Sequence, residues 1–461
     1  MDVSISKNMS TKSHDSNDES VRTKVEKIRR SRTWDPESCF GSDGVPRKPA
    51  ISLHPTRQMV HFHNVMEATK PFRGHPMHTH GSYSGPWIEN LWIETFHGKP
   101  PETFGPFVPL FVQWVDICNR VSYEHIAEVL RSVLKDNVRY VTVSQADFGL
   151  KFDGVDISRL FPNILVLSAG GYGHVPLPLL KGELSRATTC REAQRCSKTR
   201  YMSFVGRKHF GRSDLVEAVE RTLSTVDESL DQYRGDEWDA VIASSQFYLA
   251  PRGYGRTSFL LYEALQLGVT PVYVYDDLEW LPYRDRIPWK EMIVSVNRGT
   301  LLSSDGPRKL LETLDRASKR RTNFQRHASA LRDSHFTFAG VLKQIEGFLL
   351  GGESRSDLRC ERGGLPANPG LYVVRSTGGL FESIDTDASG TVDAAELVKS
   401  LSSFQVLDDG GNTAIVSMTR DDIETFLSHA DINDDRILSR KEWASQERNF
   451  RKLIEQKIVR S

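Results

Sequence analysis

The chain has 461 residues, of which 38% are hydrophobic and 26% charged, and its formal net charge at pH 7 is zero. This length exceeds that of one ordinary domain, and the apolar content is enough for more than one core, so we expect a globular protein of several domains. Balanced charge without a basic patch disfavours nucleic acid as a partner. The sequence also has no apolar run of the length of a membrane span or of signal-peptide type.

The first 50 residues are rich in Ser, Asp, Lys and Arg, which predicts a disordered tail over 1–50. Histidines cluster shortly afterwards, and His-x-His pairs can bind transition metals. Three tryptophans, Trp87, Trp92 and Trp114, follow closely and favour the packed edge of a lobe instead. The clustered histidines are His61, His63, His75, His78 and His80.

From about residue 105 the sequence alternates between strand-like and helix-like segments. Short apolar runs bounded by turn residues predict strands over 139–143, 163–167, 201–205, 246–250, 271–275 and 292–296. Apolar residues on one helical face predict helices over 123–134, 213–223, 307–316, 323–334 and 338–349. This alternation favours parallel sheets of the α/β class. We expect an amino-terminal lobe over 51–200 and a second lobe over 201–350.

The segment 351–370 is rich in Gly, Ser, Arg and Pro, which predicts a linker. The five cysteines, an odd number, indicate no disulfide framework. Cys190 and Cys196 are close enough to bridge a loop in an oxidising compartment, whereas Cys39, Cys118 and Cys360 look isolated. The redox compartment therefore stays open at this point.

A glycine-rich turn separates a predicted strand from a predicted helix within 247–268. A helix N-terminus behind such a turn offers free backbone N–H groups and a positive dipole end, which together bind anions. Arg252 and Arg256 add two positive charges suited to a diphosphate. Thr257 or Ser258 can cap the helix, and Glu263, one to two turns further on, can reach ribose hydroxyls. We expect a phosphate-bearing ligand at the carboxyl edge of this sheet, with a purely structural turn as the alternative.

The run from 247 to 283 resembles the exostosin-like glycosyltransferases. The resemblance rests on Gly255-Arg256-Thr257-Ser258-Phe259, on 262–268, on Leu281-Pro282-Tyr283 and on the upstream 203–207 with Arg212. It is specific over 200–300 and looser over 105–200. It implies a GT-B fold, in which two Rossmann-like lobes face each other across a cleft and the second lobe holds a sugar nucleotide. It also implies inverting transfer without an obligatory metal in the cleft.

This family is usually anchored in the Golgi by an amino-terminal membrane helix, which we do not recognise in this sequence. The resemblance therefore favours the Golgi or secretory lumen, and the cytoplasm stays an alternative. Without a metal, arginines and a helix N-terminus must stabilise the leaving diphosphate. We accordingly expect donor binding by Arg207, Arg252, Arg256 and Ser258, with Glu263 on the ribose.

The acceptor hydroxyl needs a general base. Asp147, at the end of a predicted strand of the first lobe, is the first candidate, although a loop cap is an equally good interpretation. His174 is the second candidate, in a glycine-rich loop over 170–174 that we expect to line the cleft.

Residues 385–396 have the spacing of an EF-hand calcium loop, in which six positions supply oxygen ligands. Gly390 stands at the sixth position, where the chain must turn sharply, and Val392 at the eighth is apolar and suited to pairing with a second loop. The expected ligands are Asp385, Asp387, Ser389, the Thr391 carbonyl, Asp393 and Glu396.

Residues 431–442 repeat this spacing, but Arg436 replaces the glycine and fewer ligands are acidic. We expect a weaker calcium site, with Leu438 packed against Val392 as the structural partner. Its ligands would be Asp431, Asn433, Asp435, the Ile437 carbonyl, Ser439 and Glu442. The region 371–461 is thus predicted to be an all-α pair of EF-hands.

Taken together, the sequence predicts a calcium-binding, inverting hexosyl- or pentosyltransferase. Its donor would be a nucleotide-diphosphate sugar, its acceptor a glycan or glycoprotein, and its EF-hands would regulate or localise it. The alternative is a calcium sensor or scaffold whose transferase-like lobes are catalytically inactive.

Overall fold

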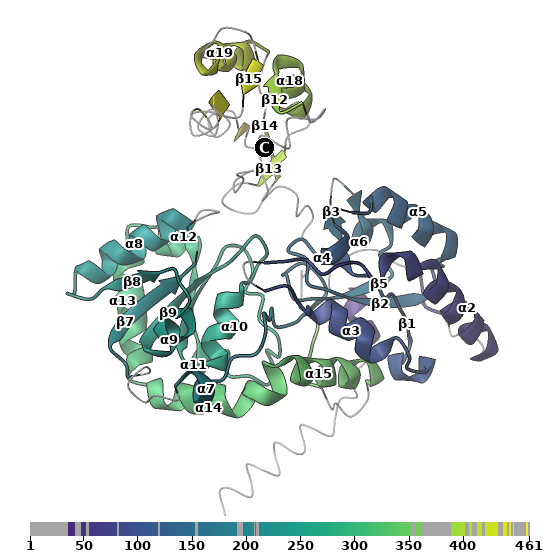
Figure 1. Ribbon diagram of the computed structural model, residues 1–461, viewed down its shortest axis with the longest axis horizontal. Coiled ribbons are helices and arrows are strands. Elements are labelled where there is room, and N and C mark those ends of the chain that lie inside the picture. Colours follow the sequence, from purple (N-terminus) through teal and green to yellow (C-terminus); the bar gives the residue numbers. More distant parts are fainter. Residues whose placement is uncertain are drawn as a thin grey trace, which may run out of the picture.

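The structure of the protein is a computed structural model. It describes residues 36–41, 48–51, 55–80, 83–118, 120–152, 155–190, 197–206, 208, 212–351, 356–361, 389–401, 405–407, 413–416, 420–431, 437–439, 442–443, 446 and 458–459. The larger part of these residues forms two α/β lobes, each built on a parallel sheet (Figure 1).

The first lobe contains a four-stranded sheet in the order β1–β2–β5–β6, with every neighbouring pair parallel. Its central strands are buried along their whole length, as expected for a sheet covered on both faces. The strands are β1 (Phe107–Pro109), β2 (Arg139–Ser144), β5 (Ile164–Ser168) and β6 (Val175–Pro176). Around them lie η1 (Pro36–Gly41), α2 (Pro55–Ala68), η2 (Lys70–Phe72), α3 (Ile88–Phe96), η3 (Pro101–Phe104), α4 (Trp114–Ile117), α5 (Tyr123–Val133), β3 (Lys151–Phe152), β4 (Val155–Asp156) and α6 (Ile157–Leu160).

The second lobe contains a five-stranded parallel sheet in the order β11–β10–β9–β7–β8. Its strands are β7 (Arg200–Val205), β8 (Leu230–Tyr233), β9 (Ser245–Pro251), β10 (Thr270–Tyr275) and β11 (Val294–Asn297). Its helices are α7 (Arg186–Thr189), α8 (Arg212–Ser224), α9 (Trp238–Ala243), α10 (Phe259–Gln266), α11 (Trp289–Met292), α12 (Arg298–Leu301), α13 (Gly306–Ser318), α14 (Arg321–His335) and α15 (Phe338–Leu350). The α/β class with parallel sheets is therefore confirmed.

The last of these helices, α15, packs on the first lobe, although it lies within the range predicted for the second. It contacts α3 and η3, and Lys99 of the first lobe lies 3.9 Å from Glu346. The contact is close at Gly105, where an added Cβ would lie 2.2 Å from the Leu349 carbonyl oxygen. The two lobes are thus joined by a helix as well as by the chain between them. Among the described helices, none combines the length and apolarity that a membrane crossing needs.

Two expectations about the chain ends are wrong for the residues described. Cys39 and Cys360, which look isolated in the sequence, form a disulfide across a separation of 321 residues. Cys39 lies in η1, within the predicted disordered tail, and its side chain is fully buried. A pairing between such distant positions cannot be inferred from cysteine spacing. Cys190 is also disulfide-bonded, whereas Cys196, its expected partner, lies outside the described residues.

The carboxyl-terminal module contains the predicted contact between its two loops. Strand β12 (Thr391–Asp393) pairs antiparallel with β15 (Ile437–Ser439), and Val392 stands opposite Leu438, both fully buried. The all-α expectation is wrong, since a three-stranded antiparallel sheet is also present. This sheet consists of β13 (Gln405–Leu407), β14 (Thr413–Val416) and β16 (Ile458–Val459), and the module's helices are α18 (Ala394–Leu401) and α19 (Arg420–Ala430).

Candidate functional site

The glycine-rich turn joins β9 to α10 at the carboxyl edge of the second sheet. The turn is closed by a 2.9 Å hydrogen bond in which the Gly253 N–H donates to the Thr257 carbonyl oxygen. Ser258 is the N-cap residue of α10, but its side chain makes no capping hydrogen bond. Its hydroxyl is buried and has no hydrogen-bond partner. A buried polar group without a partner costs about 1–3 kcal/mol, so this position is suited to a ligand that supplies the missing hydrogen bond.

Arg252 and Arg256, which flank the turn, are buried and ion-paired. The Arg256 guanidinium donates from Nε and Nη2 to Asp277 Oδ2, at 2.9 and 2.6 Å. Arg252 Nη1 donates to Asp276 Oδ2 at 3.2 Å. Burial acts to raise the pKa of Asp277, but the charge and hydrogen bonds of Arg256 together with the charge of Arg252 lower it overall. Both predicted diphosphate ligands are therefore held by carboxylates here.

The sequence analysis assigned no role to Asp276 and Asp277, although the parallel order of the two strands indicates where they lie. Strands β9 and β10 are parallel, with Val274 aligned to Pro251. Residues that follow these two strands therefore emerge side by side, which places Asp276 next to Arg252. One carboxylate oxygen of Asp276 is buried and has no hydrogen-bond partner.

The turn packs directly on the first lobe, and we refer to Gly170–Tyr172 with Gly255–Arg256 as the lobe contact. A Cβ added at Gly255 would lie 1.8 Å from the Gly170 carbonyl oxygen, and one at Gly171 would lie 2.5 Å from the Arg256 nitrogen. Only glycine permits so close an approach of two backbones. The Arg256 guanidinium also lies 4.6 Å from the centre of the Tyr172 ring, a cation–π distance.

Asp147, the first candidate base, lies at this contact. Its residue is exposed to solvent, and its Oδ1 accepts a 3.3 Å hydrogen bond from the Gly255 N–H. The protein packed around the carboxyl raises its pKa, an effect that nearby Arg252, Arg212 and His78 oppose. An accessible carboxyl with a raised pKa has the properties of a general base.

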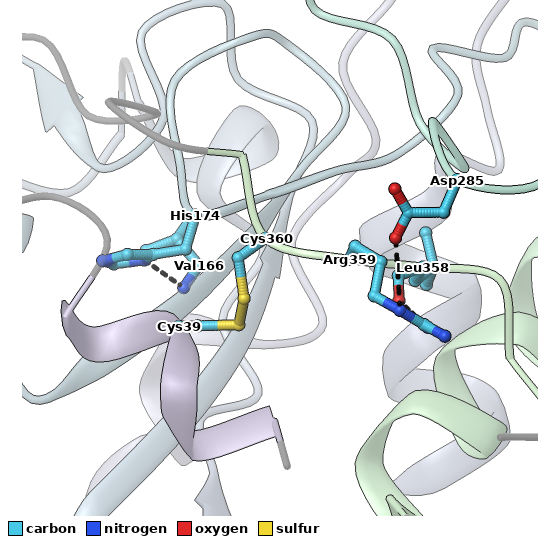
Figure 2. The surroundings of a disulfide bond; sticks show 7 residues. All are labelled: Cys39, Val166, His174, Asp285, Leu358, Arg359 and Cys360. Atoms are coloured by element: carbon cyan, nitrogen blue, oxygen red, sulfur yellow. Dashed lines mark hydrogen bonds and ion pairs between the residues drawn. A yellow bond between two sulfur atoms is a disulfide. The ribbon is translucent and has the colours of Figure 1, made fainter. Parts of the chain in front are cut away.

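His174, the second candidate base, is directed elsewhere. Its side chain is 1% exposed, and its Nδ1 accepts a 3.0 Å hydrogen bond from the Val166 N–H. Its ring centre lies 5.9 Å from that of Phe40, beside the Cys39–Cys360 disulfide (Figure 2). The His174 ring therefore packs away from the glycine-rich turn. Of the loop over 170–174, only Gly170–Tyr172 lies at the lobe contact.

Glu263, the candidate ribose ligand, is buried in α10, and burial raises its pKa. The opposing charge is Lys181, whose Nζ lies 3.9 Å from Glu263 Oε1 and 5.5 Å from the centre of the Trp238 ring. No sequence motif contains Lys181, so sequence reasoning missed it. Arg207 lies outside the described residues.

Arg212 supports the turn from behind. Its Nε donates to the Arg252 carbonyl oxygen at 2.9 Å, and its Nη2 donates to the Pro251 carbonyl oxygen at 3.2 Å. Burial lowers its pKa to about 10, so the side chain stays charged at neutral pH. Arg212 therefore fixes the backbone that carries Arg252.

The described residues contain no cluster of three or more His, Cys, Asp or Glu side chains arranged for a metal ion. Among the histidines, His61 Nε2 is hydrogen-bonded to the Tyr140 hydroxyl at 2.8 Å, which agrees with the packed lobe edge. Of the expected calcium ligands, Asp385, Asp387, Asn433 and Asp435 lie outside the described residues.

The calcium-loop ligands that are described have local partners. Glu396 accepts a 3.2 Å hydrogen bond from the Asp393 N–H, and Glu442 accepts a 3.0 Å bond from the Ser439 N–H. Gly390 has a φ of +82°, the left-handed conformation expected at the sixth position. Asp431 is half-buried at the end of α19, and Ser389, Thr391 and Ile437 lie in or beside the paired strands.

Comparison with known proteins places the chain in no family. No family model matches it. No curated protein matches it either. Among solved structures, WaaG, a glycosyltransferase involved in lipopolysaccharide biosynthesis, is 11% identical, with 66% of this chain and 98% of that one covered and a TM-score of 0.31. The spinosyn forosaminyltransferase SpnP is 13% identical, with 57% and 66% covered and a TM-score of 0.25. Identities and TM-scores this low carry no inference about fold or function, so the mixed α/β architecture is shown by the sheets themselves.

Proposed function

We propose that the protein is a glycosyltransferase that moves a sugar from a nucleotide-diphosphate sugar to a glycan or glycoprotein acceptor. The observation that carries this proposal is the unpartnered, buried hydroxyl of Ser258 at the N-terminus of α10, beside Arg252 and Arg256. Helix N–H groups, a hydroxyl and two guanidinium groups at the carboxyl edge of a parallel sheet are the chemistry that a diphosphate requires. The resemblance to exostosin-like glycosyltransferases covers the same turn.

In this proposal the transfer inverts the anomeric centre. The acceptor oxygen attacks the anomeric carbon, the bond from that carbon to the diphosphate oxygen breaks, and the nucleoside diphosphate leaves with the electron pair. Asp147 takes the acceptor proton, and its raised pKa suits that role. Arg252, Arg256 and the α10 N-terminus stabilise the charge on the leaving group, and Glu263 binds the ribose. Arg207 is a further proposed ligand, and His174 is not carried forward because it is buried beside the disulfide.

Donor binding requires a rearrangement at the lobe contact. The Arg252 and Arg256 side chains are 7% and 5% exposed, so a diphosphate reaches them only when Gly170–Tyr172 withdraws. The diphosphate then replaces Asp276 and Asp277 as the partner of the two guanidinium groups. The exchange keeps both buried guanidinium groups paired, but it takes the partners away from the two aspartates, which adds to its cost.

The test is a comparison of Ser258→Ala with the unmutated protein in the presence of nucleoside diphosphates. Removal of an unpartnered buried hydroxyl leaves the free protein equally or more stable, while it weakens nucleoside diphosphate binding about fivefold or more. Ser224→Ala is the matched control, because Ser224 lies on the exposed face of α8 and bonds only the Glu220 carbonyl oxygen. Equal affinity in all three proteins would refute the role of Ser258, and no binding to the unmutated protein would refute the enzyme.

The second candidate function is a calcium-dependent scaffold with inactive lobes. It is favoured by the ion pairs that already occupy Arg252 and Arg256 in the structure. A scaffold of this kind would be stabilised by calcium and by none of the common nucleoside diphosphates. Thermal unfolding with each ligand separately distinguishes the two functions.

We further propose that the carboxyl-terminal module binds calcium. The support is the left-handed Gly390, the pairing of Val392 with Leu438, and the buried carboxylates of Glu396 and Glu442 at the last loop positions. Calcium titration of the full chain, followed by calorimetry, should give one tight site and one weaker site. Absence of heat at sub-millimolar calcium would contradict the proposal.

The disulfides bear on the cellular compartment in which the protein is located. Disulfides persist in secreted and luminal proteins and are rare in the cytosol. Cys39–Cys360 and the bonded Cys190 therefore favour the secretory pathway, in agreement with the Golgi expectation. Thiol labelling of the protein from its native compartment should leave Cys39 and Cys360 unmodified until a reductant is added.

A further inference from the structure

Residues 356–361, which we call the strap, follow α15 and are not a free linker as predicted. Three of their side chains pair in reverse order with Arg284-Asp285-Arg286 of the second lobe. Glu361 lies 2.8 Å from Arg284, Arg359 lies 3.7 Å from Asp285, and Asp357 lies 3.3 Å from Arg286. Asp357 is also 3.0 Å from His335 Nε2 at the end of α14. Leu358, between these charged residues, is fully buried, and the ladder of alternating charges adds ion pairs with the second lobe.

The other end of the strap is attached to the first lobe. Cys360 is bonded to Cys39 of η1, and the Glu361 N–H donates to the His174 carbonyl oxygen at 2.8 Å. Figure 2 shows the disulfide beside His174, with Arg359 and Asp285 on the opposite side of the strap. Phe40, next to Cys39, is buried with its ring centre 6.3 Å from that of Phe107, at the start of β1. The strap therefore connects both lobes.

The two attachments differ in strength. The disulfide is covalent, whereas the ladder consists of partly exposed ion pairs, in which Arg284, Arg286 and Asp285 of the second lobe are 38%, 37% and 68% exposed and Glu361 and Arg359 of the strap 11% and 18%. Exposed ion pairs contribute little and are screened by salt. Only two residues separate Asp357 from Cys360, and such a length of chain spans roughly 10 Å at full extension. A larger separation of the lobes must break one attachment, and the ladder is the weaker.

We propose that the strap is a latch that controls the separation of the two lobes. The Cys39–Cys360 disulfide keeps it on the first lobe, and release of the ladder from Arg284-Asp285-Arg286 allows the lobe contact at Gly170–Tyr172 and Gly255–Arg256 to open. The latch is independent of the reaction that the lobes perform.

Hydrogen–deuterium exchange of the full-length oxidised protein tests the latch. Arg284→Glu and Glu361→Arg each place like charges together, so each should raise several-fold the uptake rate at the lobe contact. The double variant restores opposite charges and should return that rate toward the unmutated value. Arg308→Glu is the control, because it reverses a charge that is paired with Glu312 on α13, away from the strap, although that pair is more exposed.

Unchanged uptake at the lobe contact in both single variants would overturn the proposal, whether or not the strap itself is loosened. A failure of the double variant to reduce the uptake of the single variants would also overturn it. If the variants do not fold, the salt dependence of exchange in the unmutated protein tests the latch instead. Its lobe contact should exchange faster at about 0.5 M than at about 0.05 M NaCl, where ion pairs are less screened, and equal rates would refute the latch.

Discussion

Removal of the Cys39–Cys360 disulfide should destabilise the protein strongly. The bond closes a loop with a sequence separation of 321 residues. In the chain-entropy treatment, a loop of that length restricts the unfolded chain by about 5–6 kcal/mol at 25 °C, and native disulfides typically contribute about 2–5 kcal/mol. Cys39 is fully buried, so alanine is a better replacement than serine, which would bury a hydroxyl. We therefore expect the Cys39→Ala/Cys360→Ala variant to lose at least about 2 kcal/mol of unfolding free energy.

Equilibrium unfolding in urea, monitored by tryptophan fluorescence, measures this loss. Cys118→Ala is the control, because it removes a cysteine that is not part of the Cys39–Cys360 bond. The reasoning is refuted if the double variant unfolds within about 0.5 kcal/mol of the unmutated protein. It is equally refuted if Cys118→Ala loses as much stability as the double variant.

Three further predictions concern single carboxylates. Glu89 of α3 is fully buried, accepts N–H groups of Val115 and Gln145, and has a pKa that burial raises to about 8. Because the pKa of Glu89 is higher in the folded than in the unfolded protein, the free energy of unfolding should fall as pH rises between about 4.5 and 8, by up to about 1.4 kcal/mol per pH unit. In urea titrations at several pH values, Glu89→Gln should flatten this dependence. An unchanged slope would mean that Glu89 is not the titrating group. Asp147→Asn should reduce sugar transfer about 100-fold or more while nucleoside diphosphate affinity, measured by calorimetry, stays within about twofold; near-normal transfer would exclude Asp147 as the base. Glu396→Gln should remove the tighter calcium site in calorimetry and leave the thermal unfolding of the two lobes unchanged, and two intact sites would contradict the ligand assignment.

The repetitive part of the fold was predictable from the sequence. The strands predicted over 139–143, 201–205 and 271–275 agree with β2, β7 and β10 to within one residue. These strands were predictable because their apolar side chains are stable only when they are buried in a sheet. By contrast, β8 (Leu230–Tyr233) was missed, because Leu-Asp-Gln-Tyr has no apolar run and only Leu230 is buried. Its strand conformation depends on pairing with β7, which is a tertiary effect.

The candidate site was predictable by residue type and less so by environment. The turn, its arginines and the α10 N-terminus lie where the pattern placed them. The sequence did not reveal that Asp277 already neutralises Arg256, nor that Gly171 packs against it, because both contacts depend on how the chain folds back. The strap was likewise predicted to be a linker, because its ion-pair partners in Arg284-Asp285-Arg286 of the second lobe lie more than 70 residues away in sequence. The pair of Arg284 with Glu361 is an example.

The central claim is the transfer of a sugar from a nucleotide donor, and donor cleavage tests it most directly. The unmutated protein and Asp147→Asn are incubated with a panel of sugar nucleotides, and the released nucleoside diphosphate is quantified. We expect release from at least one donor by the unmutated protein and a large reduction in the variant. Absence of release from every donor, together with absence of nucleoside diphosphate binding, would contradict it and leave the scaffold function.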